Sequence, residues 1–111
     1  LLLCNNPPKL EYIDYIISII VGPEVITGST RMKAGTATKL VLNMITTTAM
    51  IKLNKTYGNL MVDLTACNDK LWDRGARIVS QITKLKYDDS LQLLKNADGE
   101  VKTAIVMEAK K

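Results

Sequence analysis

The side chains best suited to chemistry gather in residues 22–39, GPEVITGSTRMKAGTATK. Two cations, Arg31 and Lys33, lie close together and follow the hydroxyl residues Ser29 and Thr30. Guanidinium, ammonium and hydroxyl groups are donors that proteins use to bind phosphate and carboxylate oxygens. These residue types predict a binding site for an oxyanion.

The same residues predict the start of a helix. Glycine and proline between residues 22 and 28 break the preceding apolar run, and Ser29 or Thr30 can cap the first free N–H groups. Arg31 and Lys33 would then lie in the first turn, where a cation costs about 0.3–1 kcal/mol because the helix dipole is positive there. A bound anion would compensate for this cost. From the residues alone, pairing of the cations with Glu24 or with another acidic residue of the fold is equally open.

Two strands are predicted before this segment and a long helix after it. Residues 1–4 and 15–21 are apolar, which predicts the last strands of a parallel α/β sheet. The segment would then lie beyond the carboxyl end of a strand, where open α/β sheets bind ligands. The helix, at about residues 30–53, is apolar on more than one face, which is typical of a buried helix. This width favours packing against a further sheet or a second subunit, although an internal core helix fits the periodicity equally well.

The remaining sequence predicts an anchor and three short helices. We expect Asp63 to be a structural anchor, since a single carboxylate specifies no acid–base pair. Asn68 can cap the first helix, and Asp88 or Asp89 can start the second. Trp72 lies off the main apolar stripe, so core packing at a helix edge is favoured over a partner contact. The stripe residues predict a small three-helix bundle: Leu71, Gly75, Ile78, Val79, Ile82 and Leu85 in the first helix, Leu91 and Leu94 in the second, and Val101, Ala104 and Ile105 in the third.

Composition excludes several classes of function. The 111 residues carry a net charge of +4 without a basic face, and only five residues are aromatic, which argues against nucleic acid binding. Because the chain has no His and its two cysteines have no metal-ligand spacing, we expect no metal site. Cys4 and Cys67 are interpreted as free buried thiols, with a disulfide left open. Without a membrane span or a signal peptide, the expected location is the cytoplasm.

The motifs resemble a known family. Residues 22–39 are similar to the signature shared by N-acetylmuramic acid 6-phosphate etherases and glucokinase regulatory proteins. Residues 55–64, KTYGNLMVDL, resemble the etherase branch, and the similarity extends from about residue 3 to residue 107. Three positions depart from the etherase pattern: Thr38 replaces the usual glutamine, Asn54 the usual glycine, and Gly75 an alanine or serine. These departures concern local helix geometry rather than the charged residues of the motif.

The resemblance implies a mainly α fold in two parts. Residues 1–64 would be the end of a sugar isomerase (SIS) domain, comprising the last strands of its parallel α/β sheet and a long buried helix. Residues 65–111 would form a small three-helix bundle that resembles ubiquitin-associated (UBA) domains. The resemblance also favours a homodimer. Because the chain begins without Met and with a lone strand, we expect it to be the C-terminal part of a longer protein.

The resemblance further implies a reaction. The etherases eliminate D-lactate from N-acetylmuramic acid 6-phosphate and rehydrate the product to N-acetylglucosamine 6-phosphate, which recycles a cell-wall sugar without a cofactor. An elimination needs a base for the carbon-bound proton and an acid for the departing oxygen. In the family these groups are glutamates upstream of this segment. We therefore expect no catalytic residue here, and no activity from the segment alone.

The residues expected to bind the sugar phosphate come from the opening segment. Arg31 is the first choice for a contact to the phosphate or to the lactyl carboxylate, because its fork suits both oxyanions, and Lys33 is the second. Glu24 could orient Arg31, bind sugar hydroxyls or cap the backbone, and the structural role is favoured. Weaker candidates are hydroxyl residues, which usually serve the backbone: Ser29, Thr30 and Thr36.

Two other functions stay open. Glucokinase regulatory proteins share the signature but use a sugar phosphate as an effector, so a sugar-phosphate-sensing regulator is one alternative. The second is a helical interaction module, which would require residues 65–111 to fold alone and capture a protein. The matches outside the signature favour the etherase.

Overall fold

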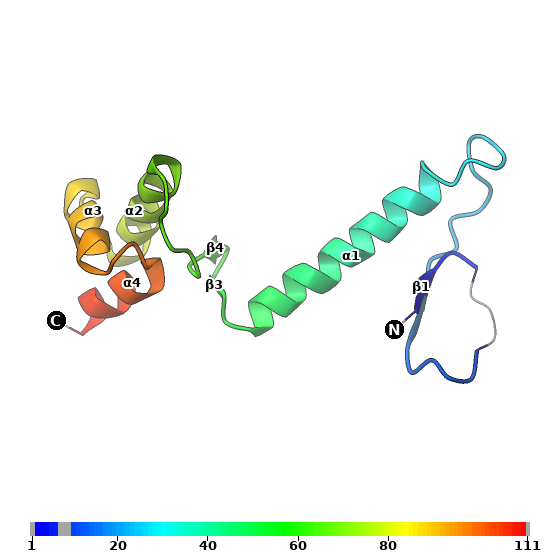
Figure 1. Cartoon of the computed structure of the whole chain (residues 1–111), viewed down its shortest axis with the longest axis horizontal. Helices are drawn as coiled ribbons and strands as arrows, with labels where there is room; N and C mark the ends of the chain where they lie inside the picture. Colours follow the sequence, from blue (N-terminus) through cyan, green and yellow to red (C-terminus); the bar gives the residue numbers. More distant parts are fainter. Residues whose placement is uncertain (1, 7–9, 111) are drawn as a thin grey trace. The chain divides into compact units, whose positions relative to one another are not determined.

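The computed structural model describes residues 2–6 and 10–110, which are mainly helical, as the sequence predicts (Figure 1). Two compact units, Leu1–Ala49 and Met50–Lys111, are described separately. The predicted domain boundary after residue 64 stays a prediction. In chain order the elements are β1 (Leu2–Cys4), β2 (Ile16–Ser18), α1 (Lys33–Lys52), β3 (Thr56–Tyr57), β4 (Leu60–Met61), α2 (Asp69–Thr83), α3 (Tyr87–Asn96) and α4 (Val101–Ala109).

In the first unit, β1 and β2 form the predicted parallel pair. Leu2 lies opposite Ile16, and Cys4 lies opposite Ser18. β2 is shorter than the predicted strand at residues 15–21, and its three residues pair with the three described residues of β1. Leu1, the first residue of the other predicted strand, lies outside the described residues.

Helix α1 begins at Lys33, three residues later than predicted, and ends at Lys52. Its C-terminal turn is closed by Asn54, which has a left-handed backbone with φ of 56°. The backbone N–H of Lys55 donates to the Met50 carbonyl at 3.1 Å in this turn. Asn is one of the few residues besides glycine that adopts this conformation readily, so the departure at this position keeps the helix end intact.

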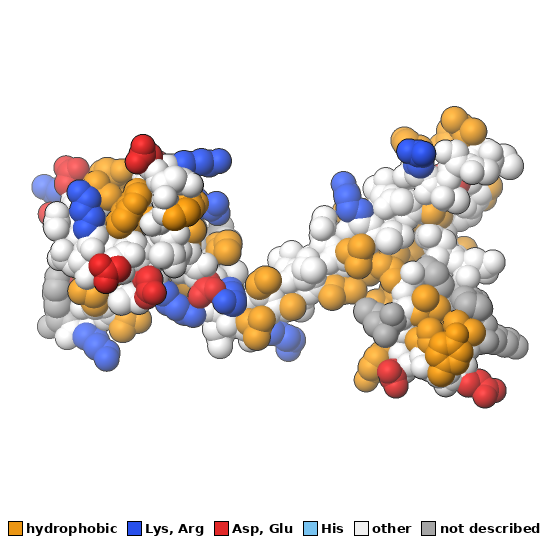
Figure 2. All heavy atoms as spheres, viewed as in Figure 1, with side chains coloured by type: hydrophobic (Ala, Val, Ile, Leu, Met, Phe, Trp, Pro, Cys, Tyr) orange, Lys and Arg blue, Asp and Glu red, His pale blue; other side chains and the backbone are white. Residues whose placement is uncertain are grey.

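Helix α1 is not an internal core helix of the described residues, so that alternative is excluded, while its cover by a further sheet or a second subunit stays a prediction. Of its residues only Ala34 is buried, whereas Leu40, Met44 and Ile51 are more than half exposed. Figure 2 shows hydrophobic side chains at the surface of this helix. Lys39 is the only charged residue between Ala34 and Ile51. A helix that is apolar all round is typical of a buried position, so α1 lacks its cover within the described residues.

In the second unit a hairpin comes before the helical bundle in the chain. β3 and β4 pair antiparallel around a turn at Gly58. Beside the hairpin, the Lys55 ammonium forms an ion pair with the Asp63 carboxylate. The carbonyl of Lys55 also accepts the N–H groups of Val62 and Asp63, each at 3.2 Å. Asp63 therefore has the structural role that the sequence favours.

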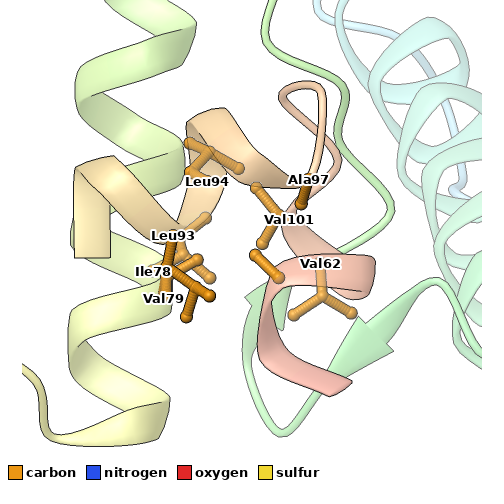
Figure 3. Close-up of a cluster of buried hydrophobic side chains, with 8 residues drawn as sticks. Val62, Ile78, Val79, Leu93, Leu94, Ala97 and Val101 are labelled. Carbon is orange, nitrogen blue, oxygen red and sulfur yellow. The ribbon is translucent and has the colours of Figure 1, made fainter. Parts of the chain in front are cut away.

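Helices α2, α3 and α4 pack around one hydrophobic core (Figure 3). Val79, Leu94 and Val101 are fully buried, and Val62 from the hairpin end contributes to the same cluster. The predicted three-helix bundle is confirmed, and Trp72 packs against its core with partial burial. The sequence pattern did not predict Leu93 as a core residue, although it is buried. The predicted core residue Leu91 is only half-buried.

Helix ends in the bundle agree with the sequence in part. The Asn68 side chain accepts the N–H of Leu71 at 3.0 Å, so the predicted cap is confirmed. Helix α3 begins at Tyr87, which places Asp88 and Asp89 in the first turn instead of at the cap. The start is earlier than predicted, and both carboxylates lie at the positive end of the helix dipole.

Two glycines in the bundle are required by close packing. A Cβ at Gly75 would lie 2.8 Å from Leu94 Cδ2 and 3.1 Å from Val101 Cγ2, so glycine lets α2 approach α3 and α4 closely. Gly75 is one of the three positions that depart from the pattern of the resembled family. Gly99 has φ of 80°, and a Cβ there would lie 3.1 Å from the Ala66 carbonyl oxygen. At this point an antiparallel bridge joins the segment before α2 to the segment before α4.

The expectation for the thiols is partly wrong. Cys67 is free, as predicted, but it is exposed because it lies in the loop just before α2 rather than in the core. The Cys4 side chain lies outside what the structure describes. Among the described helices, none is long and apolar enough to cross a membrane. In the same part of the chain no group of three His, Cys, Asp or Glu side chains could hold a metal ion.

Candidate anion-binding loop

The connection from β2 to α1 is held by a carboxylate at the helix start. Glu24 Oε2 accepts the backbone N–H of Lys33 at 3.0 Å, and Oε1 accepts the N–H of Ala34 at 2.9 Å. The first free donors of α1 are therefore occupied by a side chain from the preceding segment. Glu24, rather than Ser29 or Thr30, caps the helix, so the predicted hydroxyl cap is wrong.

The electrostatics of the cap favour the charged form of Glu24. The N–H of Lys33, followed by the N–H of Ala34, holds the pKa of this carboxyl below its ordinary value, and the Lys33 charge acts in the same direction. Partial burial opposes the shift. Since α1 has no acidic residue in its first turn, Glu24 supplies the negative charge that the positive end of the helix favours.

Lys33 contacts the same segment through its side chain. Its ammonium donates to the Pro23 carbonyl at 2.8 Å. Together with the two bonds of Glu24, this contact joins residues 23–24 to residues 33–34. Residues 25–32 consequently form a loop whose base is closed by three hydrogen bonds.

Inside the loop, the hydroxyl candidates are organised by their backbones. The N–H of Ser29 donates to the Ile26 carbonyl at 3.0 Å, across a turn that contains Gly28 with φ of 83°. The carbonyl of Thr30 accepts the N–H of Gly35 at 3.2 Å. Ser29 is half-buried and Thr30 is exposed, while Thr36 lies exposed in the first turn of α1.

Arg31 is the cation that the loop leaves available. Its side chain is exposed, and among residues 2–6 and 10–110 its guanidinium has no hydrogen-bond or ion-pair partner. The alternative in which Arg31 pairs with Glu24 is not found, and both Glu24 oxygens accept backbone donors instead. The loop thus exposes the Arg31 guanidinium, while the Glu24 carboxylate already offsets the partial positive charge at the start of α1.

Sequence reasoning missed Asn5, which lies next to this connection. Its side-chain amide Nδ2 donates to the Ile19 carbonyl at 2.8 Å in a partly buried position. Asn5 directly follows β1, and Ile19 directly follows β2. The only sequence signal was an asparagine after a strand and before prolines, which is also typical of a simple turn.

The second unit contains a cavity of about 200 Å³ beside β4 and α4. Its charged lining groups have partners: Asp63 pairs with Lys55, Glu100 accepts the Thr103 hydroxyl at 2.7 Å, and Lys102 donates to the Asn54 carbonyl at 2.9 Å. The bond from Lys102 joins α4 to the turn at Asn54, and the other two contacts are local. The cavity is therefore best explained as a structural feature of the second unit.

The chain is similar to several curated N-acetylmuramic acid 6-phosphate etherases, although no protein-family model matches it. It is 56% identical over 108 residues to an N-acetylmuramic acid 6-phosphate etherase of Rhodopirellula baltica, covering 96% of the chain and 36% of that protein. The etherase of Clostridium acetobutylicum is 60% identical over 105 residues, covering 93% of the chain and 35% of that protein. The etherase of Vibrio campbellii is 54% identical over 105 residues, covering 94% of the chain and 34% of that protein. The chain thus spans about a third of the length of these relatives.

Proposed function

The chain matches the C-terminal segment of N-acetylmuramic acid 6-phosphate etherases over nearly its whole length, and on that premise we propose that it is part of such an enzyme. The complete protein would act as a carbon–oxygen lyase that cleaves the lactyl ether of N-acetylmuramic acid 6-phosphate in the cytoplasm. Its products would be N-acetylglucosamine 6-phosphate and D-lactate. The observation that carries the proposal is the identity of 54–60% over more than nine-tenths of the chain.

In this proposal the loop at residues 25–32 contributes a contact to the substrate. Arg31 is the residue that binds the sugar phosphate or the lactyl carboxylate, because its guanidinium is exposed and has no partner among the described residues. Lys33 is the second candidate, although its ammonium already donates to the Pro23 carbonyl. Glu24 supports the loop instead of contacting substrate, since both its oxygens hold α1. Ser29, Thr30 and Thr36 are the weaker hydroxyl candidates.

The proposed domains follow the family resemblance. Residues 1–64 would complete an SIS domain, and the parallel pairing of β1 with β2 ahead of a helix supports this assignment. Residues 65–111 would be the UBA-like domain, supported by the common core of α2, α3 and α4. The base and the acid of the elimination would be glutamates of the upstream portion, so this segment supplies binding and structure without catalytic groups or a cofactor.

The exposed apolar surface of α1 supports a homodimer. Leu40, Met44 and Ile51 lie exposed along α1. Because such a helix is typical of a buried position, we propose that the remainder of the SIS domain and a second subunit cover it. Sedimentation of the full-length protein should give a dimer, and a monomer would remove the second subunit from the proposal.

The proposed activity is tested by measuring D-lactate release from N-acetylmuramic acid 6-phosphate. The full-length protein should release D-lactate, while the 111-residue segment should not. If the full-length protein binds the sugar phosphate but releases no D-lactate, the regulator of the glucokinase regulatory type is the better assignment. If it neither binds the sugar phosphate nor releases D-lactate, the helical interaction module is favoured.

A further inference from the structure

The Asn5 side chain joins the carboxyl ends of the two parallel strands. Nδ2 donates to the carbonyl of Ile19 at 2.8 Å, and these residues directly follow β1 and β2. We propose that Asn5 is a positioning residue for the sugar-phosphate site, acting through the connection that carries Arg31. This inference rests on the proposed function.

The pairing of β1 with β2 is short at this edge of the sheet. β1 and β2 each contain three residues, and β2 ends at Ser18. A pairing of this length has few ladder hydrogen bonds between the two strands, also when further strands of a complete domain extend the sheet. The partly buried bond from Asn5 therefore adds a fixed point at the place where the chain leaves the sheet.

From this fixed point the contacts lead directly to the loop. Ile19 is separated from Pro23 by three residues, which include Gly22 with φ of 70°. The carbonyl of Pro23 accepts the Lys33 ammonium at 2.8 Å, and this contact helps to close the loop that contains Arg31. The segment before the loop is thus held by Asn5 at one end and by Lys33 at the other. Loss of the Asn5 bond would free one end, and the guanidinium would be positioned less accurately for a phosphate.

The chemistry of the bond requires the amide. An alanine at this position removes the donor, and an aspartate would place a carboxylate oxygen against the Ile19 carbonyl oxygen. Asn6, the next residue, provides a matched control because it is exposed and no hydrogen bond of its side chain is described. Asn6→Ala makes the same change in composition one residue away.

The test uses the full-length protein and measures D-lactate release as a function of N-acetylmuramic acid 6-phosphate concentration. For Asn5→Ala we expect KM to rise about fivefold, less than for loss of the Arg31 contact through which Asn5 acts, with kcat within about twofold. Asn6→Ala should keep the KM of the unmodified protein. An Asn5→Ala variant that folds normally and has an unchanged KM would overturn the inference.

A double-mutant cycle separates positioning from general stability. If Asn5 acts through Arg31, the increase in KM caused by Asn5→Ala should disappear in an Arg31→Ala background. Additive effects would contradict positioning. Asn5→Ser, which is too short to reach the carbonyl, gives a second test if Asn5→Ala is poorly folded, and failure of both variants to fold would show a purely structural role. If the unmodified protein releases no D-lactate, the proposed function fails and this inference fails with it. If that protein is active but the Asn5 variants keep its KM, only the inference fails.

Discussion

Glu24 and Lys33 hold the two ends of one loop together. The Lys33 backbone N–H donates to Glu24 Oε2 at 3.0 Å, and the Lys33 ammonium donates to the carbonyl of the neighbouring Pro23 at 2.8 Å. A carboxylate of the protein itself thus occupies the helix start that the sequence offers to an external anion. The candidate contact moves from the free N–H groups of α1 to the exposed guanidinium of Arg31.

Removing the Glu24 carboxylate should loosen the start of α1. Glu24→Ala leaves the N–H groups of Lys33 and Ala34 without their acceptor, so we expect faster amide hydrogen exchange in the first turn. Exchange in α2 should not change, because the first turn of α1 belongs to the first compact unit and α2 belongs to the second. Glu11→Ala is the control, since Glu11 is exposed and is not part of the cap. Equal exchange in Glu24→Ala and the unmodified protein would contradict the capping role.

The same cap should depend on pH. Because the pKa of Glu24 is lowered by the N–H groups of Lys33 and Ala34, its contribution to stability is present above the ordinary glutamate pKa of about 4.3. That contribution is lost as the pH falls through the lowered folded value. Hydrogen exchange corrected for its intrinsic pH dependence should therefore show less protection of the first turn of α1 in acid. A Glu24→Gln variant should lack this acid-dependent loss.

Alanine substitutions at two glycines, Gly58 and Gly99, compare the cost of backbone strain alone with the cost of strain plus a steric clash. Gly58 and Gly99 both have positive φ, but only at Gly99 would an added Cβ meet close neighbours, including the Ala66 carbonyl oxygen at 3.1 Å. Gly58→Ala should lower the free energy of unfolding by about 1 kcal/mol, and Gly99→Ala should lower it by more. Urea unfolding followed by the fluorescence of Trp72, the single tryptophan, measures both. A smaller effect at Gly99 would contradict the packing described there.

Asp73 links α2 to α3 in a second pH-dependent contact. Its carboxylate accepts Arg77 Nε at 2.9 Å and the Tyr87 hydroxyl at 3.0 Å. The hydrogen bond from Arg77 is the larger cause of the lowered pKa of Asp73, and the bond from Tyr87 is the second. The hydrogen bond to Asp73 in turn raises the pKa of Tyr87. The Asp73 contribution should be lost in acid below about pH 4, and the Tyr87 contribution should be lost in base above about pH 10.

The Tyr87→Phe variant tests this link. We expect the pKa of Asp73 to rise only part of the way to its ordinary value, because Arg77 remains bound. NMR titration of the carboxyl carbon measures the change. An Asp73→Asn variant should lower the pKa of Tyr87, which the absorbance of tyrosinate reports. Unchanged titration of both groups would show that the contact is absent in solution.

Local patterns in the sequence were sufficient for several elements. Asn68 caps α2 as predicted, since its short side chain needs only the N–H of Leu71, three residues away. The parallel pairing of β1 with β2 was also predicted, because two short apolar runs before a glycine-rich helix start are typical of α/β sheets. In each case the determining contacts are close in sequence or follow a common topology.

The errors arise where a distant side chain changes a local preference. Ser29 and Thr30 are residue types that often cap helices, but Glu24 binds the N–H of Lys33, nine residues later in the chain, and α1 begins at Lys33. The Asn5 contact with Ile19 spans fourteen residues and had no signal beyond a turn. For α1, the apolar periodicity predicts burial but does not identify the surface that covers the helix.

The most direct test of the account is the effect of Arg31 on substrate binding in the full-length protein. Initial rates of D-lactate release are measured against the concentration of N-acetylmuramic acid 6-phosphate for Arg31→Ala and for Arg74→Ala, in which the control residue is an exposed arginine of α2. Loss of a charge-assisted hydrogen bond should raise the KM of Arg31→Ala about tenfold or more, with normal folding, while Arg74→Ala keeps the original KM. A folded Arg31→Ala variant with unchanged KM would contradict the account and exclude this loop from the substrate site.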